Sequence, residues 1–327
     1  MDGLVLVTGA EGFIGSHLVE ELVQQGNSVR ALVYYNFRNS WGWLESLPHE
    51  VMANIEVFPA DIRDPFAMRK AVGGCTVVFH LAALIGIPYS YVAPASYVET
   101  NAKGTLNVLQ ACLDERIHLL VHTSTSESYG TAQYVPMDES HPLVGQSPYA
   151  ASKIAADKLA ESFHLSFELP VATIRPFNTF GPRQSSRAVI PTIAAQALSG
   201  ANTIRLGALS PKRDLTYVKD TVRAFMAIAN SKLAIGRVTN IGSGEAISVG
   251  DIAKLIVELC GSDASVVLDK QRLRPAASEV QQLVCDNTWA MENLGWSPKY
   301  SLREGLMETI AWIRENLQHH KGTNYTV

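Results

Sequence analysis

The feature that most constrains this 327-residue chain is a glycine-rich turn close to its N-terminus. An apolar run at 4–8 leads into Thr8-Gly9-Ala10-Glu11-Gly12-Phe13-Ile14-Gly15, and helical spacing of apolar residues continues to position 25. Glycines spaced in this way between a strand and a helix permit a tight turn and a close approach of the backbone to a pyrophosphate. Free N–H groups at the start of the helix favour the phosphates. The turn therefore predicts a dinucleotide site that includes Gly9, Gly12, Phe13, Ile14 and Gly15.

Short β-rich runs alternate with helical patterns through the first half of the chain. The pattern predicts strands at 4–8, 29–35, 55–59, 76–81, 119–123 and 171–175, and helices at 13–25, 94–114 and 149–167. Such alternation is typical of an α/β protein with a Rossmann-type, doubly wound parallel sheet. Helical patterns at 191–198, 249–259 and 302–316 alternate with short strands in the second half. We therefore expect a dinucleotide-binding domain at 1–175, to which some later segments return, and a smaller C-terminal α/β domain, mainly 176–327, for the substrate.

Composition and charge exclude several classes of function. The net charge is −4, and no basic stretch is long enough to predict binding to a nucleic acid or a membrane surface. No apolar run reaches the roughly 18–20 residues of a membrane span, and no signal-peptide pattern is present, so we expect a cytoplasmic protein. The four cysteines lack metal-ligand spacing, and we expect no metal.

The end of the second predicted strand bears on the choice of dinucleotide. A carboxylate at this place usually binds the adenosine ribose of NAD. The sequence here is Val33-Tyr34-Tyr35-Asn36-Phe37-Arg38, without an acid, and Arg38 either pairs with a ribose phosphate or lies solvated in the loop. NAD and NADP both remain open, and we expect NADP by a small margin, with Tyr34, Asn36 and Arg38 near the cofactor. Asp61 and Ile62, after the third strand, either cap the adenine or form an ordinary turn.

A Tyr/Lys pair begins the helix at 149–167. Tyr149 and Lys153 are four residues apart, so their side chains lie on one helical face. An ammonium beside a phenol favours the phenolate and lowers the pKa of the phenol from about 10. Tyr149 is therefore a candidate general base for a hydroxyl group.

Several further motifs identify the chain as similar to a known family. They are Phe79-His80-Leu81-Ala82-Ala83, Asn101 with Gly104-Thr105, Arg175-Pro176-Phe177-Asn178, Gly181-Pro182-Arg183, Arg213-Asp214, Arg274-Pro275 and Leu294-Gly295-Trp296-Ser297-Pro298. With the glycine turn and the Tyr/Lys pair, they resemble extended short-chain dehydrogenases/reductases of the nucleotide-sugar epimerase/dehydratase type over nearly the whole chain.

The resemblance implies further site residues and a homodimer. Leu81, Ala82, Ala83 and Asn101 are expected beside the nicotinamide dinucleotide. Arg213 and Arg274, with Asn178 and also Arg187, are expected to bind the diphosphate of a nucleotide sugar, unless the arginines form surface or interdomain salt bridges. The helices at 94–114 and 149–167 are expected to form an intersubunit four-helix bundle, as in relatives.

The exit of the fifth strand indicates the kind of chemistry. In such enzymes the position of Thr125 hydrogen-bonds the sugar hydroxyl, and 4,6-dehydratases usually continue with an acid and a base. Here Ser126 replaces the acid and Glu127 remains. A Thr-Ser-Glu triplet also occurs in nucleotide-sugar decarboxylases, so this triplet does not separate the two activities. The stretches 32–44 and 142–149 resemble 4,6-dehydratases of bacterial legionaminic-acid pathways, which act on N-acetylglucosamine carried on GDP or UDP.

We therefore expect a nucleotide-sugar 4,6-dehydratase that forms a 4-keto-6-deoxy sugar. Tyr149 would take the 4-hydroxyl proton during hydride loss from carbon 4, and Glu127 would take the proton of carbon 5 before water leaves carbon 6. A 4-epimerase and a UDP-glucuronate decarboxylase of the same family are the alternatives. A dinucleotide sensor without catalysis is a further class, but such relatives typically lose the Tyr or the Lys.

Overall fold

The computed structural model describes residues 1 and 3–319 and is built on a sheet of seven parallel strands. In spatial order these are β10 (Val238–Ile241), β6 (Val171–Pro176), β5 (Leu119–Thr123), β4 (Cys75–His80), β1 (Leu4–Thr8), β2 (Ser28–Tyr34) and β3 (Ile55–Ala60). Because β2 and β3 lie on one side of β1 and β4 to β6 on the other, the strand order reverses at β1, where ligands bind in such folds. The predicted Rossmann-type fold is thereby confirmed.

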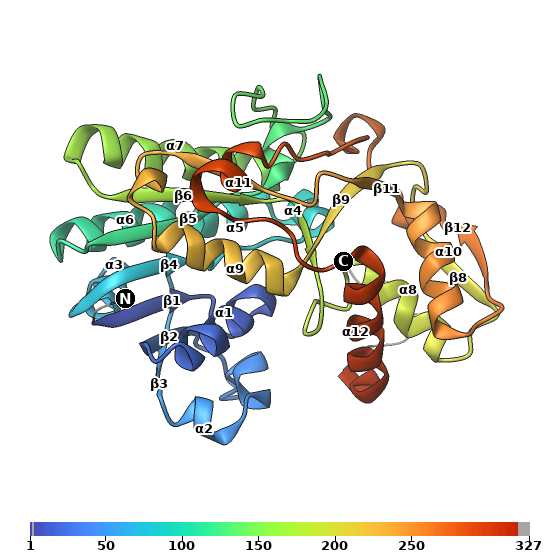
Figure 1. The fold of residues 1–327 in the computed structure, drawn as a ribbon, viewed down its shortest axis with the longest axis horizontal. Coiled ribbons are helices and arrows are strands. Elements are labelled where there is room, and N and C mark those ends of the chain that lie inside the picture. Colours follow the sequence, from blue (N-terminus) through green and yellow to red (C-terminus); the bar gives the residue numbers. More distant parts are fainter. Residues whose placement is uncertain (2, 320–327) are drawn as a thin grey trace.

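Helices cover both faces of this sheet (Figure 1). Val5 and Val7 of β1 belong to one apolar cluster with residues of α1 (Phe13–Gln24) and α9 (Val218–Ala229). Leu6, between them, belongs to a second cluster with residues of α3 (Pro65–Val72), α6 (Gly104–Asp114) and α7 (Pro148–Phe167). Successive side chains of a strand point to opposite faces, so a near-continuous apolar strand is buried on both sides.

One predicted helix differs in its internal geometry. The segment predicted as a single helix at 94–114 comprises α5 (Pro94–Tyr97), a π-helical stretch η2 (Val98–Lys103) and α6. The fully buried Asn101 lies in η2. A π-helical stretch inside an α-helix commonly marks a functional site.

The second half of the chain contributes both to this sheet and to a group of smaller elements. β10 is the edge strand of the main sheet, and α9 packs on β5 and β6. A second sheet contains β11 (Ala246–Ser248), β9 (Lys212–Tyr217) and β7 (Asn178–Phe180), and a third contains β12 (Ser265–Leu268) and β8 (Thr203–Leu206). Figure 1 shows α8 (Val189–Leu198), α10 (Val249–Cys260) and α12 (Leu302–Glu315) gathered beside β8 and β12. The remaining α-helices of the described residues are α2 (His49–Met52), α4 (Ile87–Val92) and α11 (Thr288–Leu294).

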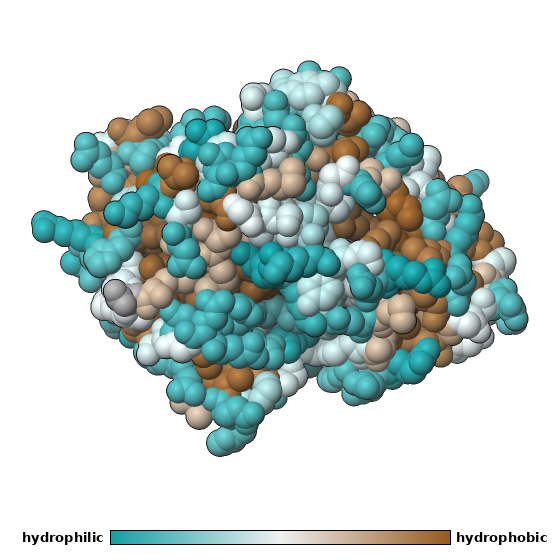
Figure 2. Space-filling model, in the orientation of Figure 1, coloured by the Kyte–Doolittle hydropathy of each residue, from teal (hydrophilic) through white to brown (hydrophobic). Residues whose placement is uncertain are grey.

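The surface is mixed in character. Figure 2 shows a largely hydrophilic face on which hydrophobic residues form separate patches. Within residues 1 and 3–319, no helix combines the length and the hydrophobicity that crossing a membrane would require.

Candidate active site

The glycine turn joins β1 to α1 and lies against the end of β4. Gly9 has a φ of +67°, and a Cβ on it would lie 2.9 Å from the backbone of Ala82. A Cβ on Gly15 would collide with the carbonyl oxygen of Gly9. The first turn of α1 has neither a side-chain cap nor an acidic residue, so its N–H groups at Phe13 and Ile14 stay available for a pyrophosphate. The turn therefore fits a dinucleotide.

The end of β4 is fixed to this turn by side-chain hydrogen bonds. The Thr8 hydroxyl accepts the N–H groups of Leu81 and Ala82, each at 3.1 Å. Asn101 accepts the N–H of Leu84 at 2.8 Å and donates to the Leu84 carbonyl and to Ser152 Oγ. Both ends of its amide are therefore occupied within the protein, so Asn101 orients the segment after β4, Ala83 included, rather than offering its amide to a ligand.

The loop after β2 uses one of its predicted site residues for its own conformation. The Asn36 amide accepts the N–H groups of Arg38 and Ser40 and donates to the carbonyls of Tyr34 and Ser40. The expectation that the Asn36 side chain faces a cofactor is therefore not supported by its contacts. Arg38 is exposed, and its guanidinium lies 5.6 Å from the centre of the Phe37 ring.

Glu11, which the sequence analysis did not single out, supplies a carboxylate at the end of β2. Its Oε1 accepts the N–H of Tyr34 at 2.8 Å. Burial raises the pKa of Glu11, against the effect of this hydrogen bond. The residue lies inside the glycine motif, where the glycines themselves dominate any sequence-based interpretation.

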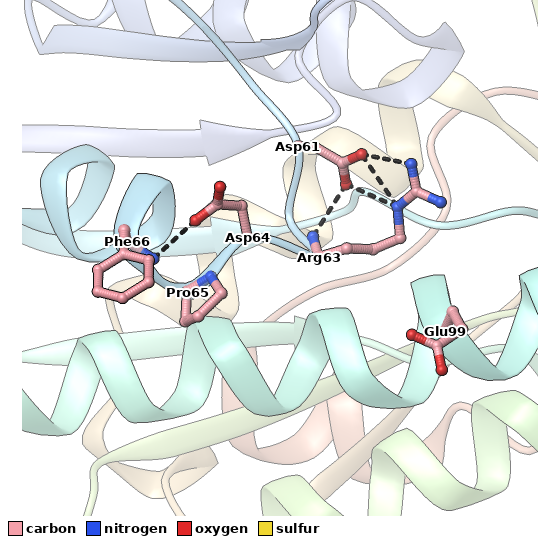
Figure 3. Close-up of a pocket in the computed structure, with 6 residues that line it drawn as sticks. All are labelled: Asp61, Arg63, Asp64, Pro65, Phe66 and Glu99. Carbon is pink, nitrogen blue, oxygen red and sulfur yellow. Dashed lines mark hydrogen bonds and ion pairs between the residues drawn. The ribbon is translucent and has the colours of Figure 1, made fainter.

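The two residues predicted near the adenine, Asp61 and Ile62, follow β3 and differ in their surroundings. Arg63 donates to the Asp61 carboxylate through Nε and its backbone N–H, which lowers the pKa of Asp61, and Figure 3 shows the guanidinium folded back on it. Both residues line an open pocket of about 540 Å³ that extends to Glu99. Ile62 is buried and packs against Gly104, so its side chain belongs to the core.

Tyr149 and Lys153 lie on α7, and both are buried. Burial raises the pKa of Tyr149, a hydrogen bond with Thr125 lowers it, and the charge of Glu127 raises it again. Burial also lowers the pKa of Lys153 to about 8, and its Nζ donates to the Thr123 carbonyl at 2.6 Å. The pKa of the phenol is therefore raised by burial and not lowered by the ammonium as expected, and Lys153 is held by the end of β5.

A buried network behind the pair includes Asp157, another residue that the sequence analysis missed. Its carboxylate accepts hydrogen bonds from Ser124 Oγ at 2.5 Å and Arg175 Nη2 at 2.8 Å, and lies 3.0 Å from His122 Nε2. Burial raises the pKa of Asp157, but the His122 hydrogen bond and the charge of Arg175 lower it below the ordinary value. Asp157 follows Lys153 by four residues, so helical spacing was the available signal.

The predicted acid–base position lies beside Tyr149. Thr125 caps the short 3-10 helix η3 (Ser126–Tyr129) by accepting the N–H of Glu127. Ser126 and Glu127 are both buried. The Glu127 carboxylate lies 3.9 Å from Arg213 Nε, on β9.

Arg213 and Arg274 come together around a third missed residue, Glu279. Its Oε1 lies 3.2 Å from Arg213 Nη2 and 3.4 Å from Arg274 Nη1. Burial lowers the pKa of Arg213, which the neighbouring carboxylates oppose. Arg213 thus lies between Glu127 and Glu279, and the Glu279 carboxylate already pairs with both arginines.

The remaining predicted substrate residues differ from each other. The side-chain oxygen of Asn178, on β7, is buried and has no hydrogen-bond partner within residues 1 and 3–319, so it can accept from a ligand. Arg187 is exposed, and its charge lowers the pKa of Tyr97 against the larger effect of burial. In the described part of the chain, no group of three or more His, Cys, Asp or Glu residues has an arrangement that could hold a metal ion.

Comparisons with known proteins agree with this geometry. Residues 6–309 match the model of the family described as GDP-mannose 4,6 dehydratase. A UDP-N-acetyl-alpha-D-glucosaminuronate decarboxylase of Bacillus cytotoxicus is 33% identical over 320 residues, which are 95% of this chain and 97% of that protein.

Two solved structures represent other activities. UDP-glucose 4-epimerase of Thermotoga maritima, with UDP-glucose, has a TM-score of 0.87 and 31% identity over 96% of this chain and 99% of its own. The dTDP-glucose 4,6-dehydratase DesIV of Streptomyces venezuelae, with NAD bound, has a TM-score of 0.86 and 27% identity. The match covers 97% of this chain and 99% of that one. The solved neighbours named with a cofactor bind NAD, which does not support the expected small preference for NADP.

Proposed function

Because the chain belongs to the family of nucleotide-sugar dehydratases, epimerases and decarboxylases, the extended short-chain dehydrogenases/reductases, we propose that it is a 4,6-dehydratase. Its substrate is N-acetylglucosamine carried on UDP or GDP, and its product is the 4-keto-6-deoxy sugar. The observation that carries the proposal is the buried Glu127, whose charge acts on Tyr149 and whose backbone N–H is bound by Thr125. A simple 4-epimerase needs no such carboxylate.

Oxidation at carbon 4 begins at Tyr149. The phenol, hydrogen-bonded to Thr125, takes the proton of the 4-hydroxyl as general base. Lys153, held on the Thr123 carbonyl, keeps a positive charge near the reacting oxygens below about pH 8. A nicotinamide dinucleotide held on the glycine turn, at Gly9 and the N–H groups of Phe13 and Ile14, would supply the hydride acceptor for carbon 4 and the hydride donor for carbon 6.

Glu127 is the acid–base group for the elimination of water. The 4-ketone makes the proton of carbon 5 acidic, and the carboxylate of Glu127 removes it. Ser126, an alcohol, is a poor acid for the departing 6-hydroxyl. Glu127, once protonated, passes its proton to oxygen 6 in a syn elimination, which needs only one carboxyl within about 3 Å of both atoms. Hydride addition at carbon 6 is completed by a proton from solvent at carbon 5, and Tyr149 releases the proton of the 4-hydroxyl, so that water is the only net loss.

The diphosphate is bound by Arg213 and Arg274, and Asn178 accepts a hydrogen bond from the substrate through its unpartnered amide oxygen. Guanidinium groups suit this task because their planar fork matches phosphate oxygens. The cofactor is NAD, as in the solved dehydratase relative. Val98, Leu106, Leu165 and Phe167 are exposed on η2, α6 and α7, and we propose that these helices form a homodimer.

A UDP-glucuronate-type decarboxylase is the second candidate. It is supported by the Thr125-Ser126-Glu127 triplet and by the 33% identity with the Bacillus cytotoxicus enzyme. A decarboxylase removes a carboxyl group from carbon 5 of the oxidised sugar and needs no base for a carbon 5 proton.

The deciding experiment supplies UDP-, GDP-, dTDP- and CDP-sugars, including a glucuronate, and identifies the products by mass spectrometry. Loss of 18 mass units from UDP- or GDP-N-acetylglucosamine is expected of the dehydratase. Loss of carbon dioxide from the glucuronate, with no dehydrated product from any sugar, would refute the dehydratase.

Glu127→Gln and Ser126→Ala then test the proton shuttle. Glu127→Gln should reduce the cofactor on mixing with substrate, visible as absorbance of the reduced nicotinamide, but stall before water is lost. Ser126→Ala should keep much of the activity. If both variants are equally inactive, a second acid must take part.

A further inference from the structure

The end of β2 lacks the carboxylate that binds the adenosine ribose in many dinucleotide enzymes, but the space beside it contains another one. β2 ends at Tyr34, and no acid follows before Arg38. Glu11, from the glycine turn after β1, reaches across to this strand end, where its Oε1 accepts the Tyr34 N–H at 2.8 Å. The carboxylate is thus joined to the backbone position next to which the missing acid would stand.

The second oxygen of this carboxylate is unsatisfied. Glu11 Oε2 is shielded from solvent and has no hydrogen-bond partner within residues 1 and 3–319. A shielded acceptor without a donor is rare in folded proteins and calls for an explanation. The Glu11 residue as a whole is only partly buried, so its carboxylate lies at the margin of the surface rather than in the core.

The loop after β2 supports Glu11 from behind. The backbone N–H of Trp43 donates to the Glu11 carbonyl at 3.0 Å. Gly42 has a φ of +57°, and a Cβ on it would lie 2.7 Å from that carbonyl. The Trp43 ring packs edge-on against the Trp312 ring of α12, with 5.0 Å between the ring centres, and this contact anchors the loop. This tight contact fixes the backbone of Glu11 beside the end of β2.

We propose that Glu11 replaces the missing strand-end acid: it accepts the adenosine ribose hydroxyls of NAD and excludes NADP. A ribose hydroxyl supplies the donor that Oε2 lacks, whereas a 2′-phosphate would bring like charges together. The neighbouring cations do not compensate, because Arg63 is paired with Asp61 and the guanidinium of Arg38 lies over Phe37 in solvent. The inference rests on the proposed use of a nicotinamide dinucleotide and adds the residue that selects its form.

The test measures the binding of NAD+ and NADP+ to the purified enzyme after removal of any bound dinucleotide, by calorimetric titration without sugar. The wild type should bind NAD+ more tightly by about tenfold or more, since juxtaposed like charges cost at least this much. Glu11→Gln should improve NADP+ binding about tenfold and change NAD+ binding much less. Glu11→Asp, which keeps the charge, should keep the preference for NAD+.

Glu21→Gln is the matched control, because Glu21 lies on α1 and its carboxylate contacts only the solvent-exposed Gln25 among the hydrogen bonds of the described residues. It should leave both affinities unchanged. A wild type that prefers NADP+, or a Glu11→Gln variant with the wild-type ratio of affinities, would overturn the role of Glu11. Because the titration contains no sugar, failure of the dehydratase assignment would not affect this result, and loss of the Glu11 effect would leave that assignment intact.

Discussion

The cofactor side and the substrate side of the site satisfy their polar groups in different ways. On the cofactor side, Thr8, Asn101 and Asp157 have their hydrogen bonds made within the protein, largely to backbone groups or to buried partners. On the substrate side, Arg213 and Arg274 share one carboxylate, that of Glu279, and the amide oxygen of Asn178 has no partner among the described residues. Apart from Glu11, whose Oε2 has no partner among the described residues, the first side is organised before any ligand arrives, whereas the second must exchange partners when a ligand binds.

This difference has an energetic meaning. A group that is already fixed loses little freedom on binding, so the cofactor side can hold a dinucleotide through a full reaction cycle. A diphosphate must compete with Glu279 for two guanidinium groups, and only the surplus contributes to its affinity. Tight cofactor binding and exchangeable substrate binding are what a cycle with an internally regenerated cofactor requires.

The largest effect is expected at the boundary between the two sides. Tyr149→Phe removes the phenol hydroxyl that Thr125 and Glu127 both influence, and the rate of hydride transfer should fall about 10³-fold or more, since a general base contributes up to about 10⁴-fold. Stopped-flow absorbance of the reduced nicotinamide measures this step. Dinucleotide content after purification should be unchanged, and normal turnover would exclude Tyr149 as the base.

Asp157→Asn tests how far the cofactor side depends on its buried charges. The change leaves Arg175 buried without a counter-charge, so the free energy of unfolding should fall by about 3 kcal/mol. Chemical denaturation measures it, with Asp114→Asn on the exposed end of α6 as a control that should change little. Stability equal to that of the wild type would show that the network can be neutral.

The same network gives a pH dependence with a defined sign. The pKa of Asp157 is lower in the folded chain than in the unfolded chain, so its stabilising contribution is complete above the unfolded pKa of about 4. It is lost as the pH falls below that value, because the carboxylate then takes up a proton. The difference in unfolding free energy between wild type and Asp157→Asn should therefore shrink in acid.

Arg274→Ala tests the exchangeable side. Loss of one charge-assisted contact to a diphosphate should raise KM about tenfold and change kcat less. Arg69→Ala is the control, because Arg69 is exposed on α3 and its ion pair is with Glu115. Steady-state kinetics measures KM and kcat of both variants. Equal KM values would show that Arg274 does not bind the diphosphate.

The contrast between the two sides also explains what could be predicted from the sequence. The glycine turn and the pair Tyr149 and Lys153 are local patterns, because a turn and one helical face place their residues within a few positions of each other. The cluster of Arg213 and Glu279 joins residues 66 positions apart, and nothing in their local sequence indicates that they pair. The contacts of Asn36 and Asn101 could not be predicted either, because the sequence does not distinguish an amide that hydrogen-bonds within the protein from one that binds a ligand.

The smallest effect is expected for Arg38→Ala, which separates two explanations of cofactor choice. If Arg38 bound a ribose phosphate, its loss would weaken the binding of NADP+, and not that of NAD+, by about tenfold or more, which is the contribution of a charge-assisted contact. Its guanidinium is exposed over the Phe37 ring, and exposed charge pairs contribute about 1 kcal/mol or less. We therefore expect both affinities to change by less than about threefold, measured by the same titration as for Glu11. Only a selective loss of NADP+ binding would restore Arg38 as the residue that selects the dinucleotide, and Glu11→Gln would then leave that selection unchanged.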